Sequence, residues 1–433
     1  MNRTLLSTRI AFALLSASLA GCGGQDLEQQ ASTVAKSNAE RVEIPQVSAA
    51  DSDLFASDNE AFALAAYQKM AASDGNIVFS PASISIALAM AYAGAAGNTA
   101  SEMATAMHYT LPPERLHLAF DALDLALGSR GEGKQGADGG PMRLHVVNAA
   151  WAERTYSFKS GYLDVLATNY GAGINLLDFI TGSASARLTI NDWVAVQTEN
   201  KILDLLPENS LTSATRLVLT NAVYFNAAWR QAFDPQRTND GKFTLLNGSQ
   251  VTSKFMSVDL SNAPALQGAG FVAVDLPYQD ERLSLLVVVP DSGTFTAFES
   301  SLDAPKLDSI VAGLAPQAVM LGLPRFKIET KQSLADLLMA LGMTSAFSYG
   351  SADFSGMDGT RNLYISKVIH KAFIDVAEKG TEAAAATAVT MNAGAAPPQG
   401  LRISVNRPFL YFLRDQPTGA ILFMGRVLDS TKN

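Results

Sequence analysis

The residue types that could carry catalytic chemistry are few in this sequence and lie far apart. The four histidines do not show the spacing of metal ligands: His108, His117, His145 and His370. The sequence contains no G-x-S-x-G, S-x-x-K, H-E-x-x-H or Walker motif. A G-x-G-x-x-G match at Gly131, Gly133 and Gly136 neither follows a predicted strand nor opens a predicted helix, which argues against a dinucleotide site. A catalytic pair of carboxylates remains an alternative, but no motif predicts an enzyme, a metal site or a cofactor.

A different kind of chemistry is suggested by the segment EKGTEAAAATA, which runs from Glu378 to Ala388. Read as a β-strand, it places small uncharged or apolar residues on one face: Thr381, Ala383, Ala385, Thr387, Val389, Met391 and Ala393. The other face carries Glu382 and Asn392, and the first proline is Pro397. This pattern is typical of a strand with one buried face that is small enough to enter between existing strands. An exposed alanine-rich helix and a low-complexity linker without a function are equally compatible with this pattern.

The composition requires a folded protein and makes polyanionic partners poor candidates. The chain has 433 residues, of which 48% are hydrophobic and 17% charged, so it can form a large core. Its formal net charge is -9 and no basic block opposes that charge. We therefore expect no nucleic-acid partner.

The lone cysteine, Cys22, excludes an intramolecular disulfide and marks the end of a leader. The apolar stretch Ile10 to Ala20 follows Arg3 and Arg9 and is too short to span a bilayer. It ends in LAGC, which resembles a bacterial lipobox. We predict a lipoprotein signal peptide over residues 1–21, lipidation of Cys22 and a flexible polar tether over 22–53. The expected location is extracytoplasmic and lipid-anchored, at the outer membrane, because glycine follows the cysteine.

Residues 54–433 are predicted to form one α+β domain, because strands and helices do not alternate regularly. A capping box at Ser57 and Glu60 predicts the first helix, and Ser80 followed by Pro81 predicts the start of a second, buried helix. Strand-like runs cover 216–225, 282–290 and 318–330, and a leucine-rich helix covers 333–343.

Several of these segments resemble landmarks of the serpin family of serine protease inhibitors. EKGTEAAAATA resembles the reactive-loop hinge, and SVNRPFLYFLR (404–414) resembles the signature that follows the loop. The segments NIVFSPASISIALAMAYAGA, LVLTNAVYFNAAWRQAF and LPRFKIETKQSLADLLMALGM match other landmarks in the same order. The resemblance covers about residues 54 to 430.

The resemblance implies a fold and a mechanism. The fold has a large central, mostly antiparallel sheet with further sheets, a helical cluster and an exposed reactive loop at about 378–400. The mechanism is one-to-one suicide inhibition, in which a serine protease attacks the loop and becomes covalently attached. Cysteine proteases are a second expected target class. The cut loop then enters the central sheet as a new strand. Such a protein acts as a monomer without a cofactor, and it is not an enzyme.

The resemblance also assigns roles to individual residues. The loop hinge comprises Glu378, Gly380, Thr381, Ala383, Ala384, Ala385 and Ala386. A polar cluster that lets the sheet open comprises Ser80, Ser83, Asn221 and His370, although a satisfied core histidine and helix-capping serines explain the same residues. Trp229 and Glu378 match the place where the loop first enters the sheet.

The reactive bond is predicted less sharply. Counting from the hinge places it at Gly394–Ala395, and cleavage between Met391 and Asn392 is the main alternative. The small residues around Gly394 suit elastase-like or subtilisin-like proteases, and no arginine or lysine lies between Gly380 and Gly400 for a trypsin-like enzyme. The rival function is a non-inhibitory serpin, a binding or chaperone-like module that is cleaved without trapping the protease.

Overall fold

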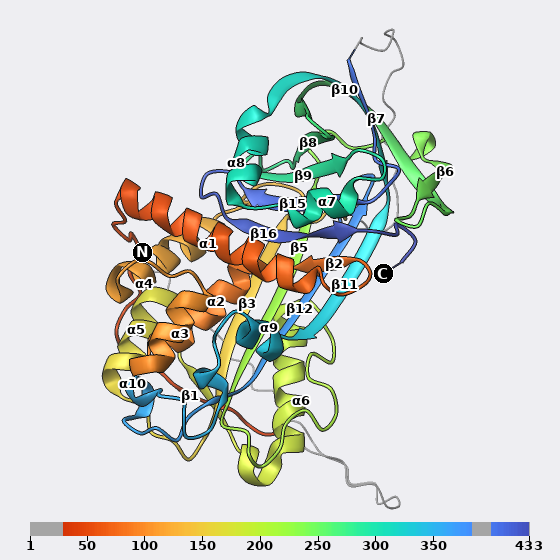
Figure 1. The fold of residues 1–433 in the computed structure, drawn as a ribbon. Helices are drawn as coiled ribbons and strands as arrows, with labels where there is room; N and C mark the ends of the chain where they lie inside the picture. The colour runs from red at the N-terminus through yellow and green to blue at the C-terminus, as the bar shows by residue number, and fades with distance from the viewer. Residues whose placement is uncertain (1–28, 383–399, 433) are drawn as a thin grey trace, which may run out of the picture.

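Two β-sheets organise the chain in the computed structural model, which describes residues 29–382 and 400–432 (Figure 1). The first sheet has seven strands and is mostly antiparallel, with parallel pairs between β3 and β4 and between β5 and β12. Its strands, in spatial order, are β1 (Thr33–Ala35), β4 (Ile174–Leu177), β3 (Arg143–Glu153), β5 (Leu217–Ala228), β13 (Gly380–Thr381), β12 (Ile365–Ala377) and β11 (Phe326–Ser333).

The second sheet has nine strands and contains the end of the chain. Its main path is β14 (Leu401–Ser404), β10 (Ala315–Pro324), β7 (Gln250–Gly268), β8 (Phe271–Pro277), β9 (Leu283–Pro290), β15 (Phe409–Asp415), β16 (Ile421–Val427) and β2 (Ile77–Phe79), and β6 (Asn239–Thr244) pairs with β7. The predicted strand over 318–330 is divided at Arg325, because β10 belongs to this sheet and β11 to the seven-stranded one.

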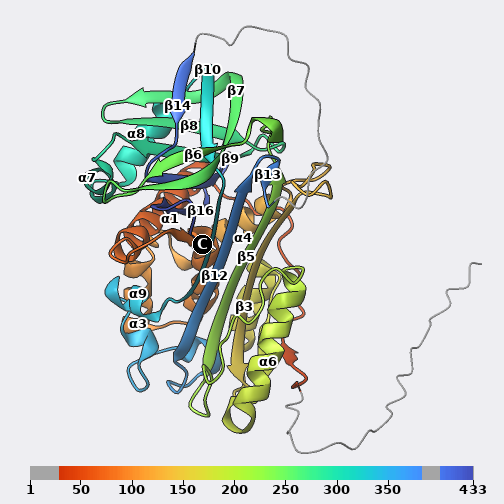
Figure 2. The same cartoon turned by 90° about the vertical axis from the view of Figure 1, so that its right-hand side faces the viewer.

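The helices lie mainly on one side of the seven-stranded sheet, and α6 lies on the other (Figures 1 and 2). The α-helices are α1 (Ala49–Met70), α2 (Pro81–Tyr92), α3 (Gly97–Ala106), α4 (Pro113–Gly128), α5 (Ser160–Tyr170), α6 (Phe179–Gln197), α7 (Phe295–Ser300), α8 (Ala304–Gly313), α9 (Ala335–Ala340) and α10 (Ser355–Asp358). The helix predicted after Ser80 is α2, and the Ser80 hydroxyl accepts a hydrogen bond from the backbone N–H of Ser83 at 3.4 Å.

Strand β5 is buried on both faces, which explains its nearly continuous apolar sequence. Leu219 and Val223 face the main core together with α2, whereas Val218 and Ala222 pack against α6. A strand inserted beside β5 would therefore have to fit between two packed layers.

The N-terminal segment differs from the predicted free tether, because residues 29–48 pack on the domain. Strand β1 pairs with the edge strand β4, and the Arg41 guanidinium contacts Asp121 at 2.8 Å and Asp124 at 2.6 Å. Ser48 caps α1 by accepting a hydrogen bond from the backbone N–H of Asp51, so the helix begins well before the predicted capping box. Ser57 and Glu60, the residues of that predicted box, lie inside α1.

The described residues contain neither a membrane-spanning helix nor a cluster of metal-ligating side chains. No helix within the described residues is both long and apolar enough to cross a membrane. Across residues 29–382 and 400–432, no group of three or more His, Cys, Asp or Glu side chains is arranged to hold a metal ion.

Candidate functional site

The predicted loop hinge begins inside the seven-stranded sheet, at one end of the boundary between β5 and β12 (Figure 2). Gly380 pairs with Ala228 and Ala377, and Thr381 pairs with Ala227 and Val376, so β13 is antiparallel to both neighbours. A Cβ atom at Gly380 would lie 1.9 Å from the carbonyl oxygen of Ala227. Glycine is therefore required here by the close approach of two backbones.

Thr381 has the buried position that its role as the first inserted residue predicts. Its side chain is 1% exposed, and its hydroxyl lies 2.6 Å from the hydroxyl of Tyr278. Tyr278 in turn stacks on Trp229 with ring centroids 4.4 Å apart. The space around Thr381 is closed by these rings, and a larger or charged residue would not fit without displacing them.

Trp229 holds the chain that leads into the hinge by two hydrogen bonds. Its indole N–H donates to the carbonyl of Ala377 at 2.9 Å, and its backbone N–H donates to the carbonyl of Lys379 at 2.9 Å. The next turn adds a bond from the backbone N–H of Phe233 to the carbonyl of Glu378 at 2.8 Å.

The Glu378 carboxylate fastens the same segment to residues that immediately precede β11 and β6. It accepts hydrogen bonds from Arg325 Nε at 2.8 Å and from the Thr238 hydroxyl at 2.5 Å. Burial alone would raise the pKa of Glu378, but the bonds from Arg325 and Thr238 outweigh it and hold the pKa below the usual carboxyl value. Glu378 is therefore charged at neutral pH.

Farther along the same boundary, β5 and β12 pair directly with each other. The parallel pairing runs from Leu217 opposite Ile365 to Val223 opposite Ala372. The predicted polar cluster lies in this closed part, and the structure brings all four of its residues together in buried positions: Ser80, Ser83, Asn221 and His370.

The hydrogen bonds of this cluster assign the tautomer of His370. The backbone N–H of Ser80 can only donate, and it lies 3.1 Å from His370 Nε2, so Nε2 accepts. His370 Nδ1 therefore carries the proton and donates to Asn221 Oδ1, while Asn221 Nδ2 donates to the Ser83 hydroxyl. Burial lowers the pKa of His370 to about 3, so the ring is neutral at physiological pH.

Comparison with known proteins shows which family has this arrangement. A family model described as "Serpin (serine protease inhibitor)" matches residues 57–430. This chain belongs to the serpin family. An uncharacterized serpin-like protein of Thermococcus kodakarensis is 39% identical over 365 residues, which cover 84% of this chain and 83% of that protein. The human leukocyte elastase inhibitor is 35% identical over 360 residues, which cover 81% of this chain and 92% of that protein.

Solved structures agree with the serpin fold. Tengpin, a thermophilic serpin in its native state, superposes with a TM-score of 0.81 at 26% identity, covering 92% of this chain and 99% of its own. Thyroxine-binding globulin in complex with thyroxine gives a TM-score of 0.77 at 28% identity, covering 87% of this chain and 99% of its own. The predicted α+β serpin fold, with its large mostly antiparallel sheet, is confirmed.

Several predicted residues of this serpin lie outside the described residues. They are Cys22, Ala383, Ala384, Ala385, Ala386, Met391, Asn392, Gly394 and Ala395. Their predicted roles stay predictions.

Sequence reasoning missed other residues that the serpin places at the site. Asn148 from β3 joins the polar cluster by accepting a hydrogen bond from the Ser83 hydroxyl at 3.2 Å. Tyr278, Arg325 and Thr238 contact the hinge. Asn148 and Asn221 are opposite each other in the β3–β5 pairing, so a correct alignment of these strands would have identified Asn148. No local sequence signal marks Tyr278, Arg325 or Thr238.

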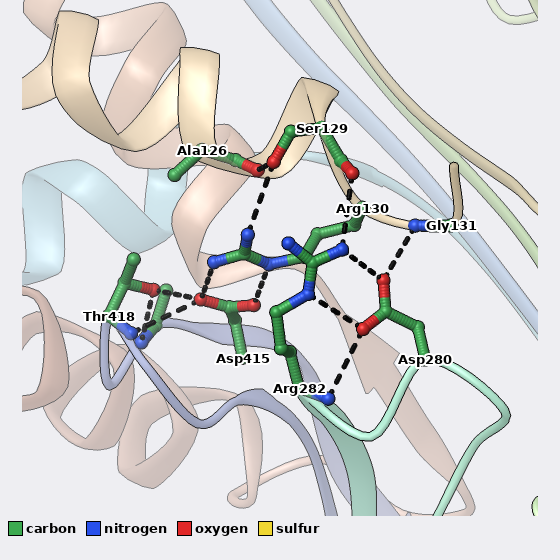
Figure 3. Close-up of polar contacts among 9 residues, drawn as sticks. Ala126, Ser129, Arg130, Gly131, Asp280, Arg282, Asp415 and Thr418 are labelled. Atoms are coloured by element: carbon green, nitrogen blue, oxygen red, sulfur yellow. Dashed lines mark hydrogen bonds and ion pairs between the residues drawn. The ribbon is translucent and has the colours of Figure 1, made fainter. Parts of the chain in front are cut away.

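The glycine-rich loop between α4 and β3 also reaches the hinge region of the serpin. Its start is anchored by Arg130, which donates to Asp415 at 2.5 and 3.0 Å, and by the backbone N–H of Gly131, which donates to Asp280 at 2.7 Å (Figure 3). Farther along, the backbone N–H of Ala137 donates to Asn226 Oδ1 at 2.7 Å. The G-x-G-x-x-G match thus belongs to a loop fastened over the end of β5.

Proposed function

We propose that this serpin is a suicide inhibitor of serine proteases that traps the enzyme by inserting its cut loop between β5 and β12. The observation that carries the proposal is the position of Gly380 and Thr381, which already pair with both strands at one end of this boundary. Farther along the boundary, β5 and β12 pair directly with each other, so a further strand would enter the sheet by separating these two strands.

The first step is ordinary proteolysis of the loop. The serine hydroxyl of the protease attacks the carbonyl carbon of Gly394, an ester forms between them, and the bond to Ala395 breaks with its nitrogen taking up a proton. The fragment that begins at Ala395 contains β14, β15 and β16, which belong to the nine-stranded sheet. It therefore stays bound until the protein is denatured.

The second step is insertion, and the pairing of β13 predicts its register. If the strand continues in this register, Thr387 lies between Asn221 and His370, and Met391 lies beside Leu217, the first residue of β5. The residues on the face of Thr381 would then meet the main core. The only polar residue among the next positions of that face, Thr387, would fall on the polar cluster, where its hydroxyl can replace the separated Asn221–His370 bond. This match between loop and sheet supports insertion.

The register also favours Gly394 over Met391 as the acylated residue. With Met391 at the start of β5, an ester at Gly394 leaves a few residues to connect the inserted strand to the protease. An ester at Met391 would leave none. About ten new strand residues, at roughly 1 kcal/mol for each hydrogen bond, would contribute as much free energy as a whole domain's stability. The uncut form is then metastable and held back kinetically.

The target class that fits best is an elastase-like or subtilisin-like protease with a small primary pocket. Ala393, Gly394 and Ala395 are all small, and the human relative that is 35% identical is named a leukocyte elastase inhibitor. A cysteine protease forms an equivalent acyl-enzyme through its thiol and is a second possible target class.

Incubation of the purified protein with an elastase, a chymotrypsin-like enzyme and a subtilisin tests the function. We expect a complex that survives denaturing electrophoresis and a denatured C-terminal peptide whose mass begins at Ala395. A peptide that begins at Asn392 would move the reactive bond to Met391. Clean cleavage by all three enzymes without a complex would favour the non-inhibitory alternative, a binding or chaperone-like serpin.

We also propose that Cys22 is lipidated and anchors the serpin outside the cytoplasm, at the outer membrane. The LAGC sequence supports lipidation. Because the domain begins to make contacts at Gln29, only a few residues would separate it from the lipid. Labelling with a radioactive fatty acid during expression in a bacterial host should mark the protein and fail to mark Cys22→Ser. Equal labelling of both would contradict the anchor.

A further inference from the structure

The chain leaves the seven-stranded sheet at Glu382, the last described residue of the hinge. Its backbone N–H still donates to the carbonyl of Asp375 at 2.6 Å, as a continuing strand would require. Its φ angle is +57°, however, which is left-handed and turns the chain away from β12. An L-residue other than glycine, asparagine or aspartate rarely adopts this conformation without contacts that hold it.

Two side chains supply contacts that hold Glu382. Asn226 Nδ2 donates to the carbonyl oxygen of Glu382 at 3.0 Å, and Lys201 Nζ lies 2.5 Å from its carboxylate Oε1. The carboxylate is largely buried, with its side chain 11% exposed, and Oε2 finds no hydrogen-bond partner among the described residues. Lys201 is therefore the one described cation that pairs with this buried charge.

Lys201 comes from a segment that the structure fixes firmly on the outer face of the sheet. Residues 198–206 follow α6 and precede β5, and their neighbour Ile202 is 1% exposed in the core beneath α6. The same segment accepts hydrogen bonds from Lys371 to the carbonyl of Leu203 at 3.2 Å and from Lys331 to the carbonyl of Asp204 at 2.6 Å. Lys201 thus connects the hinge to a segment that is packed and hydrogen-bonded on the layer covering the β5–β12 boundary.

We propose that Lys201 is a positioning residue that latches the hinge at its resting depth, with only Gly380 and Thr381 inserted. This inference rests on the proposed function and adds to it the group that sets the starting point of insertion. Without Lys201, the Glu382 carboxylate is a largely buried charge with no described cation to pair with it, and its most favourable response is to move into water. That movement withdraws Thr381 from the sheet. Neutralising Glu382 as well removes the cause of the withdrawal.

Hydrogen exchange of the uncut protein tests the latch without any protease. In Lys201→Gln, we expect the amides of residues 380–382 to exchange at least tenfold faster than in the natural protein. In the double variant Lys201→Gln with Glu382→Gln, we expect exchange to return to within about threefold of the natural rate. Lys331→Gln is the matched control, because it removes a lysine contact to the same segment but does not touch the hinge.

Three results would overturn the proposal. The first is unchanged exchange at 380–382 in Lys201→Gln. The second is equally fast exchange in Lys331→Gln, which would show that loosening of the segment suffices. The third is failure of the double variant to restore slow exchange, which would assign Lys201 a merely structural role.

A kinetic measurement separates the latch from the proposed function. If the natural protein traps an elastase, Lys201→Gln should consume at least threefold more inhibitor per protease trapped, because the withdrawn hinge starts insertion later. If the natural protein traps nothing, the proposed function fails, while the exchange experiment still decides whether the latch exists. Trapping with an unchanged inhibitor requirement would contradict the effect of the latch on insertion.

Discussion

The two ends of the β5–β12 boundary differ in whether a strand already lies between β5 and β12. At the hinge end, β13 already separates the strands, and contacts from the Glu378 carboxylate and Trp229 fasten the chain that leads into it. At the other end, β5 and β12 pair directly over a buried polar cluster in which His370 is neutral. The hinge end is open, and the end with the cluster is still closed. Under the proposed mechanism, the barrier to insertion would lie at the cluster, and the hinge end would determine where insertion begins.

The largest expected effect comes from a substitution that prevents the loop from entering the sheet at the hinge end. Thr381→Arg would place a charge in a position that is 1% exposed and packed against Tyr278. A buried unpaired charge costs several kcal/mol, so the strand should not enter. We expect at least a tenfold loss of denaturation-resistant complex on gels while cleavage continues. Thr381→Ser keeps the hydroxyl and the small size and should trap normally; trapping by Thr381→Arg would contradict the insertion path.

Removing the cluster at the closed end should affect stability first. Asn221→Ala leaves the N–H of His370 and the Ser83 hydroxyl without the amide between them. A buried donor without a partner costs about 1–3 kcal/mol, so the uncut protein should lose about 2 kcal/mol of unfolding free energy in urea. An uncut variant as stable as the natural protein would show that the cluster does not hold the strands together.

The pH dependence of the unfolding free energy tests whether His370 in the polar cluster is neutral. The pKa of His370 is about 3 and that of His117 is about 4, because burial disfavours the charged rings, against 6.5 for both in the unfolded chain. The unfolded state therefore binds more protons below about pH 6.5, and the stability contributed by the neutral rings is lost as pH falls toward 3. Urea unfolding between pH 7 and 4 should show this slope. His370→Gln should reduce it, and an unchanged slope would place the effect elsewhere.

Thr387→Val sharpens the comparison, because it tests the register at the point where loop and cluster are expected to meet. The hydroxyl would lie between Asn221 and His370 only after insertion, so its loss should cost about 1 kcal/mol in the cleaved protein and less in the uncut one. Guanidinium unfolding of both forms measures the difference. Equal effects on the two forms would mean that the register is wrong.

The smallest effect is expected at Glu378. Glu378→Gln removes the charge that faces Arg325, whose side chain is 48% exposed, so solvent screening limits the loss to about 1 kcal/mol or less at neutral pH. The pKa of Glu378 is lowered in the folded protein, so its contribution is present above the ordinary carboxyl pKa and is lost as pH falls. The difference between the variant and the natural protein should shrink in acid; a constant difference would argue against the ion pair.

Local sequence signals predicted the parts of the fold that local physics decides. Ser80 with Pro81 marked the start of α2, and continuous apolar runs marked β5 and β9, because these strands are buried on both faces. The start of α1 was missed, since Ser57 and Glu60 form a capping pattern that the longer helix does not use. The division at Arg325 was missed as well, because membership of two sheets is not a local property.

The residues of the site were also predictable only where the sequence carries a local or family pattern. The hinge residues stand in one segment with a recognisable pattern, and the cluster residues followed from the family resemblance. Tyr278 and Arg325 could not be predicted, because they reach the hinge from segments distant in sequence. The reason that glycine is required at position 380 could not be predicted either, because it is the closeness of the Ala227 carbonyl, which is distant in sequence.

The most direct test of loop insertion is hydrogen exchange of the complex with an elastase-like protease. The proposal predicts that amides from Ala383 to Met391 become as protected as those of β5, and that β5 and β12 remain protected on either side. It also predicts that the ester at Gly394 survives denaturation. A covalent complex whose 383–391 amides still exchange at the rate of an unstructured peptide would contradict insertion between β5 and β12.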